Sequence, residues 1–63
     1  MYCHEFFKTE KEARAFQQEQ GFGALYRKNG VSSRDDYLAE AVIAGLTLDQ
    51  MTEKPFCIAW KED

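Results

Sequence analysis

The stretch Pro55-Phe56-Cys57-Ile58-Ala59-Trp60 is the longest run of consecutive apolar residues in the chain. Charged residues bound it on both sides, with Glu53-Lys54 before it and Lys61-Glu62-Asp63 after it. A short unbroken apolar run of this length is typical of a strand that is buried on both faces. Proline suits the first position because its missing N–H costs no ladder hydrogen bond there. We therefore expect this stretch to form the central strand of a small sheet.

The chain has 63 residues, so we expect a single domain, residues 1–63, near the lower size limit for unaided folding. A hydrophobic share of 44% makes a packed core feasible and argues against disorder. The net charge of −3 argues against a broad surface for nucleic acid or anionic membranes. No apolar run approaches the roughly 20 residues of a membrane span, and the first residues resemble no signal peptide. These observations predict a cytoplasmic protein without membrane association.

The first half of the chain reads as a strand, a helix and a second strand. Tyr2–Phe7 alternates in the manner of a strand and carries aromatic residues on both faces. Thr9-Glu10-Lys11-Glu12 matches a capping box, which predicts a helix from Glu10 to about Gln20, ended by Gly21. Ala24–Lys28 then reads as the second strand, and Asn29-Gly30 marks the turn after it.

The second half begins with the helix that we expect to supply most of the core. Ser32 and Ser33 are candidate N-caps, and Gly45 is placed to end this helix. Its broad apolar face predicts that a charged residue at Leu38 or Val42 would unfold the domain. The residues of that face are Tyr37, Leu38, Ala41, Val42, Ile43 and Ala44.

A second capping box, Thr47-Leu48-Asp49-Gln50, predicts a short helix that ends at about Glu53. The pattern of helix, turn and new helix also resembles a DNA-binding helix-turn-helix. A recognition helix needs several turns with basic or amide side chains, whereas this one is acidic and is cut short by Pro55. A short helix that returns the chain to the sheet is therefore the favoured interpretation.

These elements predict an α+β fold: a small two-layer sandwich of the type β-α-β-α-β. We expect a three-stranded sheet in the order 1-3-2, with the last strand central and antiparallel to the other two. Both main helices are expected on one face of this sheet. The alternative is a fully parallel sheet with the helices on opposite faces.

Two helices on one face would leave the other face of the sheet open, with aromatic side chains exposed on it. Monomers rarely leave a large contiguous apolar patch in water. The sequence therefore predicts a small protein-interaction module that self-associates, or binds another protein, through the open sheet face. The residues expected to carry this interaction are Tyr2, Phe6, Phe56, Ile58 and Trp60.

The alternative function is weak binding of nucleic acid or phosphate at the turn that leads into the second helix. Basic residues flank this turn, and free N–H groups at a helix N-terminus are receptive to an anion. An aromatic sheet face could also stack unpaired bases. The candidate anion-binding residues are Arg27, Lys28, Ser32, Ser33 and Arg34. Asp35 and Asp36 in the first helical turn, and the acidic chain as a whole, argue against it.

We expect no catalysis, no cofactor and no metal site. His4 has no nucleophile or acidic partner placed beside it by any motif, so we interpret it as a partly exposed strand histidine. Cys3 and His4 are sequential and would point to opposite faces of a strand, which prevents joint metal ligation with Cys57. Both cysteines are therefore expected to be reduced thiols that serve as small core residues.

Overall fold

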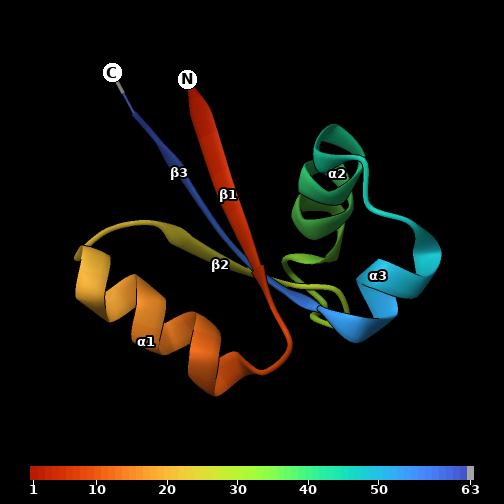
Figure 1. The fold of residues 1–63 in the computed structure, drawn as a ribbon, viewed down its shortest axis with the longest axis horizontal. Coiled ribbons are helices and arrows are strands. Elements are labelled where there is room, and N and C mark those ends of the chain that lie inside the picture. Colours follow the sequence, from red (N-terminus) through yellow and green to blue (C-terminus); the bar gives the residue numbers. More distant parts are fainter. Residues whose placement is uncertain (63) are drawn as a thin grey trace.

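The apolar stretch forms the central strand, β3 (Phe56–Lys61), of a three-stranded antiparallel sheet (Figure 1). β1 (Tyr2–Phe7) and β2 (Ala24–Arg27) lie on either side of it, in the order β1-β3-β2. The computed structural model describes residues 1–62 of the chain. Its helices are α1 (Glu10–Gln20), α2 (Arg34–Ala44) and α3 (Leu48–Glu53). The predicted α+β class, strand order and antiparallel central strand are confirmed.

The pairing register decides which side chains share a face of the sheet, because residues directly opposite each other point to the same side. Cys3 lies opposite Trp60, and Glu5 lies opposite Ile58. One face therefore carries Cys3, Glu5, Phe7, Leu25, Arg27, Phe56, Ile58 and Trp60. The other face carries Tyr2, His4, Phe6, Ala24, Tyr26, Cys57, Ala59 and Lys61.

The two main helices lie on opposite faces of the sheet, and the prediction that they share one face is wrong. On the first face, Phe16 of α1 packs against Trp60, with ring centroids 5.7 Å apart. On the second face, Tyr37 of α2 packs against Phe6, also with centroids 5.7 Å apart. Figure 1 shows the strands running between α1 and α2. The fold therefore has three layers rather than two.

The composition of β3 explains this arrangement. Ile58, on one face, and Cys57, on the other, are both fully buried. Each helix offers a single apolar stripe, so a strand that is apolar on both sides requires one helix for each side. α1 supplies Ala13 to the first face, and α2 supplies Tyr37 to the second. A central strand that is apolar on both sides is therefore the feature of the sequence that indicates a helix on each face of the sheet.

The buried side of α2 differs from the predicted one. Tyr37 and Ala41 have no exposed surface, whereas the side chain of Val42 is 72% exposed. The stripe of α2 that faces the sheet is therefore narrow: it includes Tyr37 and Ala41, whereas Val42, the next residue after Ala41, already points to solvent. We therefore expect a charge at Val42 to be tolerated, contrary to the interpretation from the sequence alone.

The predicted helix boundaries are confirmed, but the predicted caps only in part. Of the capping box at Thr9, the structure shows the hydrogen bond from the N–H of Glu12 to the Thr9 hydroxyl, and Gly21 ends α1 in the left-handed conformation. At the start of α2, the candidate cap Ser33 makes no side-chain cap hydrogen bond. Thr47 and Gln50 form the complete capping box at the start of α3. α3 spans only six residues, which is too short for a recognition helix, so the helix-turn-helix alternative is wrong.

Candidate functional site at the free edge of the sheet

The five predicted interaction residues do not form one surface. Phe56, Ile58 and Trp60 lie on the face that α1 covers, whereas Tyr2 and Phe6 lie on the face that α2 covers. Ile58 is fully buried, and only Tyr2, at 71%, is largely exposed. Among residues 1–62, a helix packs on each side of the sheet, so the predicted open face does not form.

The predicted anion-binding residues are also separated. The guanidinium of Arg27 donates a hydrogen bond from Nε to Oε1 of Glu10 at 2.5 Å, so the charge of Arg27 is already paired with that carboxylate. The hydroxyl of Ser33 accepts a hydrogen bond from the N–H of Arg27 at 2.9 Å. Lys28 and Arg34 do come together, lining a shallow hollow of about 380 Å³. Ser32 is exposed and is not among the residues that line this hollow.

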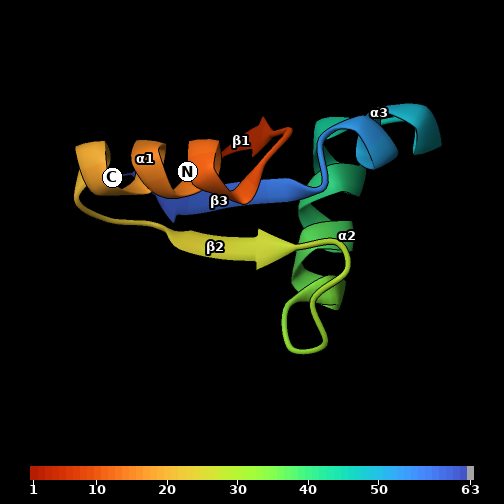
Figure 2. The same cartoon turned by 90° about the horizontal axis from the view of Figure 1, so that it is seen from below.

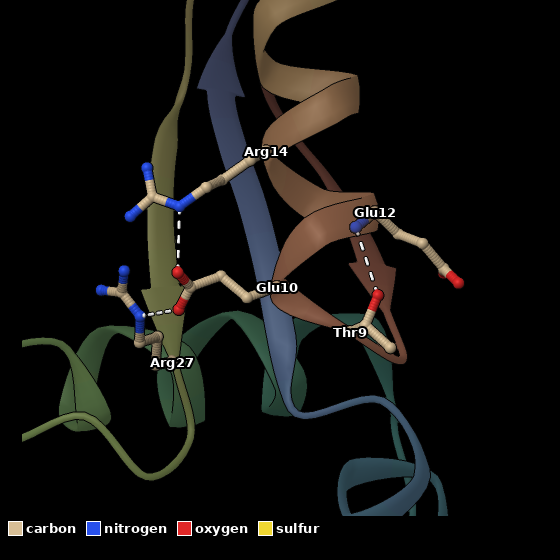
Figure 3. Close-up of polar contacts among 5 residues, drawn as sticks. All are labelled: Thr9, Glu10, Glu12, Arg14 and Arg27. Carbon is tan, nitrogen blue, oxygen red and sulfur yellow. Dashed lines mark hydrogen bonds and ion pairs between the residues drawn. The ribbon is translucent and has the colours of Figure 1, made fainter.

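Glu10 ties the start of α1 to the edge strand β2 (Figure 3). Its second oxygen accepts a hydrogen bond from Nε of Arg14 at 2.9 Å, four residues further along α1. The hydrogen bonds from Arg27 and then Arg14 lower the pKa of Glu10 to about 2. The contact with Arg27 joins residues distant in sequence, so helical spacing could not reveal it.

This ion pair predicts an acid-sensitive contribution to stability. The pKa of Glu10 is lower in the folded chain than in the unfolded chain, so the contribution is present above the unfolded pKa of about 4.5. It is lost as the pH falls towards 2. Thermal unfolding should therefore show that Glu10→Gln lowers the melting temperature at pH 7 but no longer does so near pH 2. Glu12→Gln, in the same helical turn, is the matched control; an equal pH dependence in both variants would contradict the assignment.

The two cysteines are separate free thiols. Cys3 and Cys57 lie on opposite faces of the sheet, and Cys57 pairs with Phe6 rather than with Cys3. Burial raises the pKa of the Cys57 thiol to about 12, so it stays protonated and unreactive at neutral pH. Among residues 1–62, no group of three or more histidine, cysteine or acidic side chains converges as a metal site would require.

His4 has an acidic partner that the sequence did not reveal. Its Nδ1 lies 3.0 Å from Oε2 of Glu40 on α2, and both side chains are largely buried. The two residues are 36 positions apart, and no local pattern connects them. Glu40 therefore orients the imidazole, and the contact fastens β1 to α2.

The outer edge of β1 carries unpaired backbone groups. Met1 and Glu62 exchange both of their N–H and C=O hydrogen bonds, at 2.8 Å each. In an antiparallel ladder such hydrogen-bonded pairs alternate with pairs whose groups point outward. The N–H and C=O groups of Tyr2, His4 and Phe6 therefore point away from β3. Within the described chain, β3 is the only strand that pairs with β1.

The opposite edge of the sheet is protected. β2 has only four residues, and by the same alternation Leu25 and Arg27 point their backbone groups outward. The N–H of Arg27 is already satisfied by the Ser33 hydroxyl. Short strands and covered backbone groups are the means by which natural sheets block edge pairing. The free edge of the sheet is therefore that of β1.

A groove of about 310 Å³ lies against β1. His4, Glu5 and Phe6 line one side of it, next to the outward N–H and C=O groups of His4 and Phe6. Its other wall comes from α3 and the residues around it, which Figure 2 shows beyond the end of β1. The residues of that wall are Leu46, Gln50, Glu53 and Lys54.

Comparisons with known proteins identify no relative of this chain: no family model, no curated protein and no solved structure matches it. None of the helices among residues 1–62 combines the length and the apolar character that a membrane crossing requires.

Proposed function

We propose that this protein is a small non-catalytic interaction module that binds an extended polypeptide segment at the free edge of β1. The observation that carries the proposal is the groove between β1 and α3, which lies beside the unpaired N–H and C=O groups of His4 and Phe6. An added strand would gain main-chain hydrogen bonds from the edge and side-chain contacts from the groove. This proposal keeps the predicted protein–protein function and moves it from a sheet face to a sheet edge.

The groove favours a segment that places an apolar or aromatic side chain next to Phe6. Phe6 and Leu46 supply apolar surface on one side, and Gln50 and Lys54 supply polar groups at the rim. Aromatic pairs across neighbouring strands add stability beyond their buried area. A tyrosine fits these surroundings, because its ring is apolar and its hydroxyl can reach the polar rim.

The test uses a β-prone peptide of alternating threonine and valine with one tyrosine, titrated into the full chain and followed by two-dimensional amide NMR. We expect the largest shifts at Tyr2, His4, Phe6 and the wall of α3. Total synthesis of the chain allows an N-methyl group to be placed on the amide of His4, which points outward. That variant should keep the wild-type melting temperature and lose peptide binding.

The matched control is an N-methyl group on Glu5, whose N–H points towards β3. This variant should lose stability, because it breaks a ladder hydrogen bond inside the sheet. Undiminished peptide binding by the His4 variant, or no binding by the wild type at millimolar peptide, would refute the strand-binding function.

A second proposal is weak anion binding by Lys28 and Arg34, supported by the hollow that both line. Two cations would give a shallow salt dependence and low affinity. Fluorescence anisotropy with single-stranded oligonucleotides at low salt is the test. Binding should disappear in the variant that combines Lys28→Glu with Arg34→Glu, whereas equal binding by this variant would remove the site.

A further inference from the structure

We infer that the segment bound at the edge of β1 is the β1 strand of a second copy of this chain, added antiparallel about a twofold axis beside His4. The inference rests on the proposed function and adds the identity and the register of the partner. The resulting dimer would contain one continuous six-stranded sheet, made from the three strands of each copy.

The spacing of the outward backbone groups selects this register. Tyr2, His4 and Phe6 are symmetric about His4, so two antiparallel copies place Tyr2 of each opposite Phe6 of the other, and His4 opposite His4. Each of these pairs can exchange both N–H···O hydrogen bonds. A shift of two residues in either direction leaves one outward residue of each strand without a strand partner. The symmetric register is therefore the one that satisfies the whole edge.

The side chains agree with this register. Tyr2 is 71% exposed in the single copy and lies on the same sheet face as Phe6. In the dimer, Tyr2 of one copy would sit next to Phe6 of the other, at the groove lined by Leu46 and Gln50. The groove volume of about 310 Å³ accommodates an aromatic ring. The dimer thus buries the exposed Tyr2 ring in the groove of the partner copy. The twofold axis repeats this contact, so both grooves are filled.

The charges and the other sheet edge are also compatible with a closed dimer. Glu5 of each copy lies opposite Cys3 of the other, so the two Glu5 carboxylates are diagonal neighbours rather than direct opponents. Glu40 lies 3.0 Å from Nδ1 of His4, so each of the two facing imidazoles keeps an acidic partner within its own copy. Because the β2 edge is short and capped by Ser33, the sheet does not extend further on that side. An isologous contact of this kind closes as a dimer instead of growing into a fibre.

Disulfide trapping tests the register directly. Cys3 and the opposing Glu5 form a pair that does not exchange hydrogen bonds across the new interface, with Cα atoms roughly 4.5 Å apart. This separation lies within disulfide reach. Mild oxidation of the Glu5→Cys variant should therefore yield a dimer linked through Cys3 and the introduced cysteine, identified by peptide mass mapping. Cys57 does not compete, because it is fully buried.

The control combines Glu5→Cys with Cys3→Ser. Its two introduced cysteines would be diagonal, roughly 7–8 Å apart, at or beyond the limit for a disulfide, so crosslinking should be largely lost. Sedimentation equilibrium of the reduced wild-type protein should show a monomer–dimer equilibrium. Tyr2→Ser should weaken it by about tenfold or more, as expected for an aromatic anchor in a pocket, with the melting temperature of the dilute monomer unchanged.

A wild-type protein that remains monomeric at hundreds of micromolar would overturn this inference, while the peptide titration would still decide the strand-binding function on its own. A dimer that is insensitive to both Tyr2→Ser and N-methylation of His4 would overturn it as well, because its interface would lie elsewhere. Crosslinks between cysteines in a different register would exclude the twofold axis at His4.

Discussion

Replacing Tyr37 by alanine is expected to lower the free energy of unfolding by about 3–5 kcal/mol, the range for truncating a large buried aromatic residue. A domain this small has only a few kcal/mol of net stability from its core. We therefore expect the Tyr37→Ala chain to be largely unfolded at room temperature.

The expected effect is large because Tyr37 joins three parts of the fold. Its side chain has no exposed surface, and its ring packs edge-on against Phe6 of β1. Its hydroxyl donates a hydrogen bond at 2.7 Å to the carbonyl oxygen of Lys54, just before β3. Alanine would leave a cavity between α2 and the sheet and would also leave the Lys54 carbonyl without this donor.

Urea unfolding followed by circular dichroism measures the effect, with two matched controls. Tyr37→Phe keeps the ring and removes only the hydroxyl, so we expect a loss of about 0.5–1.5 kcal/mol. Val42→Ala changes an exposed side chain of the same helix and should stay within about 0.5 kcal/mol of wild type. If Val42→Ala costs as much as Tyr37→Ala, the assignment of the buried side of α2 is wrong.

Replacing Gly23 by alanine is expected to lower the free energy of unfolding by about 2–6 kcal/mol, from two additive causes of roughly 1–3 kcal/mol each. The first is backbone strain, because Gly23 has a φ of +115°, which side-chain-bearing residues rarely adopt. The second is overpacking, because a Cβ atom would lie 2.9 Å from Cγ2 of the fully buried Ile58. The surroundings are rigid, since Gln17 also donates to the Gly23 carbonyl at 2.9 Å.

Gly21 provides the control for the steric part of this prediction. It also has a positive φ, +82°, but nothing lies within 4 Å of the position that its Cβ would take. Gly21→Ala should therefore carry the conformational cost alone, roughly 1–2 kcal/mol. Equal losses for the two variants in the same urea titration would show that the contact with Ile58 relaxes without cost.

Local signals in the sequence were enough to locate every element of the fold. The Thr9 and Thr47 caps, the glycine at the end of each long helix and the apolar run of β3 all act over a few residues. Such signals depend on backbone geometry and on the hydrogen bonds of a single turn, so they can be read without knowing the neighbours. The strand order followed because the most apolar strand belongs in the centre.

The tertiary structure decided which surfaces meet and which backbone groups stay unpaired. Whether Tyr37 or Val42 faces the sheet depends on the rotation of α2, which local spacing does not specify when the helix is apolar on several sides. The contact of His4 with Glu40 and that of Glu10 with Arg27 join residues 36 and 17 positions apart, so only the packed fold brings them together. Which N–H and C=O groups of β1 stay free depends on which of its residues bond to β3 in the ladder. That alternation is set by the pairing of the two strands and cannot be read from the sequence of either strand alone.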